Sequence, residues 1–163
     1  MLRMDHEARI LPSILDRLLD DQPEVSREPI PDRFQNLRQL KKTVTRDLEA
    51  LLNTRRELQD EPPPEFAEVR RSLMTYGLPD FTAFSLLNPH DRNRIRRAVE
   101  QVIAMFEPRL ERVRVTLQPP RQYEQALRFQ IEALLRVEPA PEPVTFDAIL
   151  QLHTKQYVVR GQD

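Results

Sequence analysis

The hexapeptide Met105–Leu110 constrains the fold more than any other stretch, because the hydrophobic pattern changes its period there. Before it, apolar residues recur at spacings of three and four, and after it they alternate, which predicts a helix followed by a strand. Pro108 disfavours a helical conformation at Glu107, so we expect the chain to leave the helix extended. Alternate side chains share a face in an extended segment. Glu107 and Arg109 would therefore project together, as an internal strut or as a recognition element.

Helical spacing dominates the chain upstream of the hexapeptide. The stretch Phe34–Asn53 has one continuous apolar face and is the clearest helix of the sequence. Residues 65–76 show a weaker helical pattern, which Gly77 closes as a left-handed C-cap. Asn88 is a typical N-cap and Pro89 suits the first helical position, so a further helix should run from there to the hexapeptide.

Alternating residues downstream of the hexapeptide predict short strands. These strands comprise residues 113–117, 127–135, 144–152 and 157–159. Proline-rich or polar turns separate them, so neighbouring strands should pair in antiparallel fashion. Because the helices come first and the strands last, we predict an α+β fold. N-terminal helices would pack on one face of a C-terminal antiparallel meander of three to four strands.

The alternation also predicts which charges face the helices. The odd positions of the first strand are apolar and should point toward the helical layer. If this register extends back through the hexapeptide, then Glu107, Arg109 and Glu111 lie on the same face, near the rim of the sheet. A buried arginine–carboxylate arrangement is costly to leave half made. We therefore expect this trio to meet either the chain's own helices or a partner chain.

The N-terminal segment has a pattern of its own and divides the chain into residues 1–32 and 33–163. A short amphipathic helix begins at Pro12 or Ser13. Its apolar stripe includes Leu15, Leu18 and Leu19. A proline-containing stretch follows, typical of a semi-rigid linker. Such a helix either folds back on the core or docks on another protein. We interpret the first segment as a partner-docking arm and the second as a single α+β domain.

Residue types limit the chemistry that the chain can perform. Cysteine is absent, glycine occurs only at positions 77 and 161, and the three histidines are scattered. We therefore predict no metal site and no cofactor. A net charge of −1 argues against a surface devoted to nucleic acid, although arginines line one face of the predicted helix that begins at Asn88. No apolar secretory segment or membrane-spanning run is visible, so we expect a cytoplasmic protein without membrane insertion.

One enzymatic hypothesis deserves testing against the residue pattern. Glu107 would act as a general acid with Glu111 or Asp147 as its partner, in the manner of a glycosidase. A general acid must keep its proton and needs an apolar pocket to do so. Arg109 would instead favour the ionised carboxylate. We therefore assign no catalytic residue.

Three motifs occur in order along the chain. They are Leu11–Leu18, Val44–Arg55 and the tripeptide Glu107–Pro108–Arg109. With these motifs the chain resembles, over nearly its whole length, the TssE family of baseplate subunits of bacterial type VI secretion systems. That family is related to the small baseplate wedge protein of contractile-tailed phages.

The resemblance implies a structural protein rather than an enzyme. It implies a fold similar to the interlocking domain of sheath subunits, which would join the baseplate wedge to the contractile sheath and start sheath polymerisation by strand addition. The implied partners are the wedge proteins TssF, TssG and TssK and sheath subunits of the TssB and TssC type. The implied location is the bacterial cytoplasm, in a baseplate near the inner membrane. The residues expected to bind partners are Glu107, Pro108, Arg109, Leu15, Leu18 and Leu19.

Two further classes stay open at this point. Phage relatives have carried a lysozyme-like label, so a peptidoglycan-cleaving enzyme is the main alternative. An arginine-rich module that binds nucleic acid is the other, and it would show affinity for DNA that falls steeply with salt.

Overall fold

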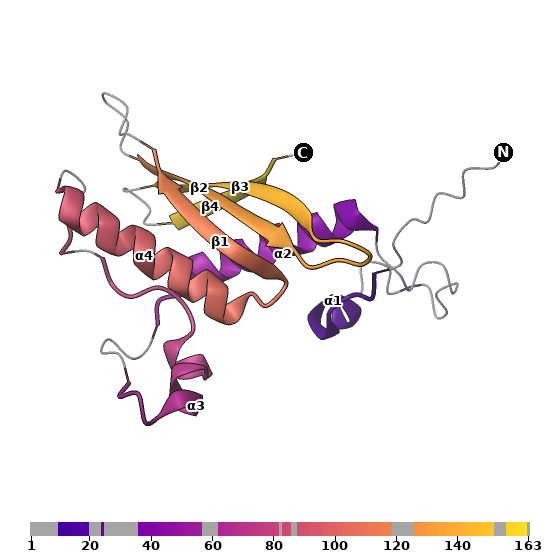
Figure 1. Cartoon of the computed structure of the whole chain (residues 1–163), viewed down its shortest axis with the longest axis horizontal. Helices are drawn as coiled ribbons and strands as arrows, with labels where there is room; N and C mark the ends of the chain where they lie inside the picture. The colour runs from indigo at the N-terminus through magenta and orange to yellow at the C-terminus, as the bar shows by residue number, and fades with distance from the viewer. Residues whose placement is uncertain are drawn as a thin grey trace.

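The computed structural model describes residues 10–19, 24, 36–56, 62–81, 83–85, 88–118, 126–151 and 156–162. The helices are α1 (Ile14–Leu18), α2 (Leu37–Asn53), α3 (Ala67–Arg70), the 3₁₀ helix η2 (Leu73–Thr75) and α4 (Pro89–Phe106). The strands are β1 (Leu110–Leu117), β2 (Ala126–Leu135), β3 (Glu142–Gln151) and β4 (Gln156–Gly161). They form one antiparallel sheet in the order β1-β2-β3-β4 (Figure 1). The predicted α+β meander is confirmed.

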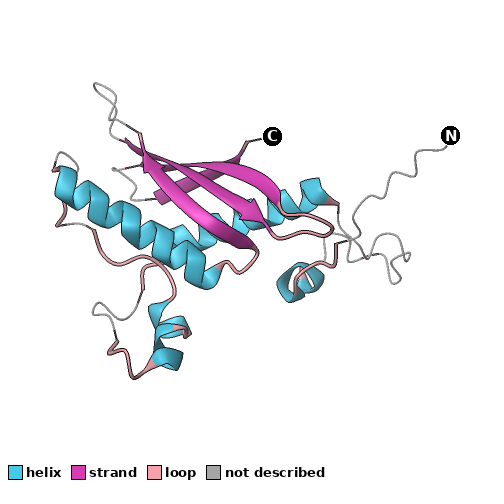
Figure 2. Cartoon of the chain, viewed as in Figure 1, coloured by secondary structure: helices cyan, strands magenta, loops and turns pink. Residues whose placement is uncertain are grey.

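The long helices α2 and α4 cover one face of the sheet, and the core lies between the two layers (Figure 2). Helix α4 packs mainly along β1, and α2 packs along β4. The sheet contributes alternate residues, so that Phe129 and Ile131 of β2 and Phe146 of β3 are almost fully buried. Alternation in the strands and a one-sided apolar stripe in the helices thus meet in a single core.

The helix predicted for Phe34–Asn53 is α2, which begins at Leu37 after a polar cap at Asn36 that was not predicted. The Asn36 side chain accepts a hydrogen bond of 2.9 Å from the Gln39 N–H, and the Gln39 side chain accepts one of 2.8 Å from the Asn36 N–H. This reciprocal pair satisfies two amide groups that the first turn would leave unbonded. The buried stripe of the helix consists of Leu40, Val44, Leu48, Leu51 and Leu52.

The helix predicted for residues 65–76 is shorter than expected. Helix α3 covers only Ala67–Arg70, and the chain then turns into η2. Ser72 interrupts the helix, because its side chain accepts a hydrogen bond from the Met74 N–H and so caps a new turn. Gly77 does take the left-handed region, with φ of +97°, as its position after the helical pattern predicts.

Helix α1 also begins as predicted, with Ser13 as its N-cap. The Ser13 hydroxyl accepts a hydrogen bond from the Asp16 N–H, and the Asp16 carboxylate accepts one from the Ser13 N–H, each of 3.1 Å. Most of the linker expected between residues 22 and 32 lies outside the described residues. The division of the chain into an arm and a domain therefore stays a prediction.

Strand β1 contains a bulge that the regular alternation does not predict. Leu110 pairs with Leu135, but Val115 pairs with Ile131, so β1 has one extra residue between these pairs. Arg112 takes up the insertion with φ of +53°. The inward face therefore changes from even to odd positions at the bulge, and Leu110 is buried while Glu111 is exposed.

The bulge makes one prediction wrong. Glu111 does not share the helix-facing side with Glu107 and Arg109. It points outward, and its carboxylate lies 3.0 Å from Nε of Arg136 in a solvent-exposed ion pair. The strand inserts a residue at Arg112, so Glu111, which comes just before the insertion, faces the side opposite to the one that regular alternation predicts.

Candidate functional site

The tripeptide Glu107–Pro108–Arg109 forms a tight turn and is not extended. Glu107 is the C-cap of α4, because its N–H donates to the carbonyl of Ile103 at 2.9 Å. The N–H of Leu110 then donates to the carbonyl of Glu107 at 3.1 Å, which closes a four-residue turn. Pro108 occupies the second position of this turn, where its fixed φ is favourable. The expectation of an extended exit from the helix is thus wrong, because proline fits a turn equally well.

The turn brings Glu107 and Arg109 into direct contact. Nε of Arg109 donates to Oε1 of Glu107 at 2.6 Å, and Nη2 donates to Oε2, which makes a two-pronged ion pair. The Arg109 N–H adds a third bond to the same carboxylate at 3.2 Å. The Glu107 side chain is only 5% exposed, whereas that of Arg109 is 23% exposed. Of the two, Arg109 is therefore the residue that reaches the surface.

The pair continues into helix α2. Nη2 of Arg109 also donates to Oδ2 of Asp47 at 2.6 Å. Oδ1 of Asp47 accepts from Nε and Nη2 of Arg46 at 2.9 and 2.7 Å. The turn at the start of the sheet is thereby tied to the middle of a helix that lies about 60 positions earlier in the chain. Of the two roles considered for this pair, internal strut or recognition element, Glu107 therefore has the first.

The same network reaches helix α1. Nη2 of Arg46 donates to Oδ1 of Asp16 at 2.7 Å, while Oδ2 of Asp16 accepts from the Ser13 hydroxyl at 2.7 Å. We call these alternating charges the charge cluster, and it consists of Asp16, Arg46, Asp47, Glu107 and Arg109. It joins the N-terminal helix, α2 and the turn before β1.

Electrostatic interactions shift the pKa values of Arg109 and Asp16. Burial by itself would lower the pKa of Arg109, but its hydrogen bonds to Glu107 and Asp47 outweigh burial and hold that pKa above the ordinary value. Burial would raise the pKa of Asp16, but hydrogen bonds from Ser13 and Arg46 outweigh it and hold that pKa below the ordinary value. These groups therefore stay charged at neutral pH and act as structural ion pairs.

Sequence reasoning missed three of the five members of the cluster, Asp16, Arg46 and Asp47. Arg46 and Asp47 lie on the polar side of α2, where charged residues are usually solvated. Periodicity identifies the buried stripe of the helix and says nothing about which polar residue meets a distant turn. The one available signal was the motif Val44–Arg55, which contains both residues and supports the family resemblance.

The apolar residues predicted on the N-terminal helix lie at a separate place on the surface. Leu15, Leu18 and Leu19 are 51%, 75% and 50% exposed. Leu11 and Ile14 extend the same surface at 73% and 79%. We call these five residues the α1 apolar surface. The Asp16–Arg46 ion pair connects α1 to the charge cluster, so the two predicted binding regions share one support without touching.

The carboxylates of the glycosidase hypothesis are not arranged as an acid and its partner. Both oxygens of Glu107 accept bonds from Arg109, Glu111 pairs with Arg136 at the surface, and Asp147 accepts from the Gln162 amide at 2.7 Å. Among the described residues no group of three potential metal ligands comes together. No helix in the described part of the chain is long and apolar enough to cross a membrane.

Three of the four arginines of α4 also make contacts within the chain. Nη1 of Arg96 donates to both carboxylate oxygens of Glu100, at 2.7 Å each. Nη2 of Arg92 donates to the carbonyl of Gln118 at 3.3 Å, and Arg94 stacks 4.4 Å above the ring of Phe84. These contacts supply the partners that arginines in the first half of a helix need. They favour a structural role over a phosphate-binding surface.

Comparison with known families tests the resemblance directly. The profile of the baseplate wedge protein gp25 family matches residues 38–140, which is more than half of the chain. A search of curated proteins gives no match. The matched range runs from α2 to the loop between β2 and β3 and contains Arg46, Asp47, Glu107 and Arg109. The chain therefore belongs to the gp25 family of baseplate wedge proteins.

Proposed function

We propose that this protein is a structural baseplate subunit of a type VI secretion system, which joins the baseplate wedge to the contractile sheath. Membership of the gp25 family supports a structural role in a baseplate. The observation that carries the proposal is the overlap of the family match with the charge cluster, since the matched range contains all of that cluster except Asp16.

Two regions of the molecule suit two different partners. The α1 apolar surface and Arg109 are both connected to the charge cluster, and we assign them to the wedge proteins of the TssF, TssG and TssK type. We assign the sheet to sheath subunits of the TssB and TssC type. These subunits would add a strand to the sheet in a baseplate near the inner membrane of the bacterium.

Glu107, Pro108 and Arg109 act in this proposal through the shape of the turn. Glu107 is buried, so it positions Arg109 and does not itself reach a partner. The Arg109 side chain is 23% exposed, although its Nη1 is buried without a hydrogen-bond partner, and a guanidinium held by two carboxylates loses little conformational entropy on binding. Pro108 is exposed and limits the turn to one backbone conformation.

The test uses the full chain with an affinity tag, expressed in its own bacterium. Replacing Leu15, Leu18 and Leu19 by serine should leave the melting temperature nearly unchanged, because these side chains are already at least half exposed. We expect the variant to lose wedge proteins from the purified complex, as identified by mass spectrometry. The matched control is Leu73→Ser, since Leu73 is 85% exposed and lies on η2, away from α1.

Two outcomes would reject the proposal, and a third would reject one part of it. Failure of the unaltered chain to capture wedge or sheath subunits would reject the proposed function. Capture of wedge subunits by the serine variant at the level of the unaltered chain would reject only the assignment of the α1 apolar surface to them. Release of soluble fragments from peptidoglycan by the purified chain would support an enzyme instead, and we expect no product.

A further inference from the structure

The two edges of the sheet differ in whether they can accept another strand. In an antiparallel sheet, the residues of an edge strand that do not bond their neighbour turn both the N–H and the C=O outward. In β4 these are Tyr157, Val159 and Gly161, and in the regular part of β1 they are Val115 and Leu117, as the registers and the bonds from Gln162 and Gln118 to the neighbouring strands show. The partners of these groups decide which edge is open.

Helix α2 closes the edge of β4 at Tyr157 and Val159. The Asn53 side chain accepts from the Tyr157 N–H at 2.8 Å and donates to the Tyr157 carbonyl at 2.9 Å, as a neighbouring strand would. Oε2 of Glu49 accepts from the Val159 N–H at 2.9 Å. On the same side β3 extends beyond β4 and carries Pro143, which has no N–H to offer. A strand could add here only by displacing three hydrogen bonds of the fold.

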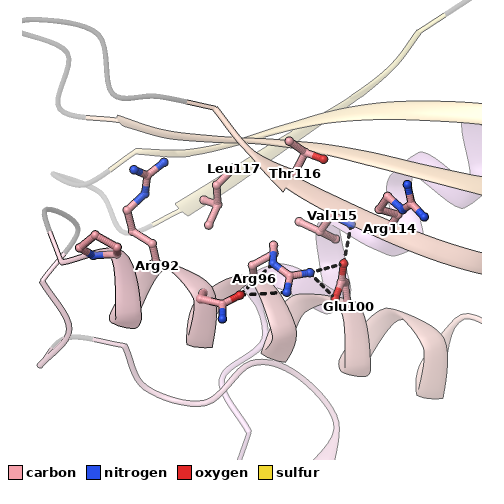
Figure 3. A pocket seen from close by; sticks show the side chains of 9 residues that line it. Arg92, Arg96, Glu100, Arg114, Val115, Thr116 and Leu117 are labelled. Atoms are coloured by element: carbon pink, nitrogen blue, oxygen red, sulfur yellow. Dashed lines mark hydrogen bonds and ion pairs between the residues drawn. The ribbon is translucent and has the colours of Figure 1, made fainter.

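At the edge of β1, a single carboxylate bonds one of the outward-facing backbone groups. Oε1 of Glu100 accepts from the Val115 N–H at 2.9 Å (Figure 3). Strand geometry turns the N–H and C=O of Leu117 outward as well, and no side chain of the described residues bonds them. The bulge at Arg112 ends regular pairing on the other side, so residues 114–117 are the regular part of this edge.

A groove runs between this part of β1 and the first half of α4. It has a volume of about 490 Å³ and opens to solvent. Its charged lining consists of Arg92, Arg96, Glu100 and Arg114, so positive groups exceed negative ones by three to one. Nε of Arg92 is buried and has no hydrogen-bond partner. The groove therefore favours an occupant that brings a carboxylate to Arg92.

We propose that β1 is the edge of the sheet that accepts the incoming strand, and that Glu100 is a plug which this strand displaces. The occupant is an extended segment of a sheath subunit, and this inference rests on the function proposed above. A backbone carbonyl of the segment replaces Glu100 as the acceptor for the Val115 N–H. An acidic side chain of the segment, facing α4, binds Arg92.

The absence of cysteine in the chain allows a direct test by disulfide formation. Thr116 lies on the exposed face of β1 and Arg160 on the exposed face of β4, so each can carry a single cysteine beside its edge without entering the core. Each full-length variant, T116C or R160C, is mixed with sheath subunits of the same bacterium that carry single cysteines along their terminal arms. The mixtures are then oxidised, and the linked peptides are identified. Directly opposed residues of paired strands are close enough for a disulfide.

We expect T116C to link to one arm position at a yield at least tenfold above that of R160C. Equal or higher yield from R160C would overturn the proposal. If neither variant links while the unaltered chain still co-purifies with sheath subunits, the choice of edge is wrong but the proposed function stands. If the unaltered chain captures no sheath subunit, the proposed function fails and this inference fails with it.

Two further variants test the plug and the groove. Glu100→Gln keeps the shape of the side chain but weakens its bond to Val115, so T116C linkage at limiting sheath protein should rise about fivefold, equivalent to about 1 kcal/mol. Arg92→Glu should reduce linkage at least tenfold, and a lysine or arginine in place of the acidic arm residue should restore it. An unchanged yield in Glu100→Gln, or no restoration in the second case, would contradict the assigned roles.

Discussion

The Arg109 guanidinium donates hydrogen bonds to both carboxylate oxygens of Glu107, two residues earlier in the chain. The two residues lie on either side of Pro108, in a turn that the bond from the Leu110 N–H to the Glu107 carbonyl closes. This pair lies where helix α4 ends and the sheet begins, so it sets the angle between the two layers. Its buried member cannot be removed without leaving the other member charged and only partly bonded.

Glu107→Gln tests this pair at nearly constant side-chain volume. We expect a loss of about 2 to 3 kcal/mol in the free energy of unfolding, below the full cost of breaking a buried pair because Arg109 is partly exposed and keeps Asp47. Urea denaturation measures this change in the free energy of unfolding. The control is Glu111→Gln, which removes an exposed pair with Arg136 and should change stability by less than about 0.5 kcal/mol. Equal effects of the two substitutions would show that burial of Glu107 contributes nothing.

The bulge in β1 predicts an unusual order of stability among variants at position 112. Arg112 has φ of +53°, which costs a residue with a Cβ about 1 kcal/mol or more. Arg112→Gly should therefore unfold no more easily than the unaltered chain, although glycine normally weakens a strand. Arg112→Val should destabilise the protein by about 1 to 2 kcal/mol, because β-branched residues avoid backbone conformations with positive φ. This would be so although valine normally stabilises a strand. Thermal unfolding of both variants gives the order, and a more stable valine variant would refute the bulge.

Gly77 is a third site at which backbone conformation decides the outcome. Its φ is +97°, and an added Cβ would lie 2.2 Å from the carbonyl oxygen of Thr54. That oxygen accepts the Leu78 N–H at 2.8 Å, so it has little freedom to move. We expect Gly77→Ala to destabilise the protein by at least about 2 kcal/mol in urea denaturation. A neutral result would show that segments 54–56 and 77–78 do not pack as described.

Helix α1 should detach from α2 in acid. The pKa of Asp16 is lower in the folded protein than its ordinary value of 3.8, because bonds from Ser13 and Arg46 outweigh burial. A carboxylate with a depressed folded pKa stabilises the fold above its unfolded pKa and loses that contribution as the pH falls. Release should therefore occur between about pH 4 and pH 2. Amide exchange of the α1 residues, measured by NMR, reports it.

The matching variant is Asp16→Asn, which cannot titrate at this position. In that variant the exchange of α1 should be fast at neutral pH already and should show no further change in acid beyond the intrinsic pH dependence. Protection of α1 that persists to pH 2 in the unaltered chain would mean that Asp16 does not hold the helix.

Local sequence was sufficient for most of the architecture. Apolar spacing placed α2 and α4, and alternation placed all four strands, because both periods reflect which side of an element faces the core. Polar caps were readable for the same reason, since Ser13 and Asn88 act on their own helices. The family resemblance rested on motifs that are themselves short and local.

Tertiary structure decided everything that joins distant segments. The partner of Arg109 on α2 is Asp47, and no periodicity connects a polar helix position with a turn 62 residues later. The bulge at Arg112 reversed the face of Glu111, because one inserted residue shifts the register of everything before it. Closure of the β4 edge by Asn53 depends on a contact across 104 residues. Short-range preferences thus set the elements, whereas side-chain contacts in three dimensions determined which charges are buried and how α2 and α4 cover the two edges of the sheet.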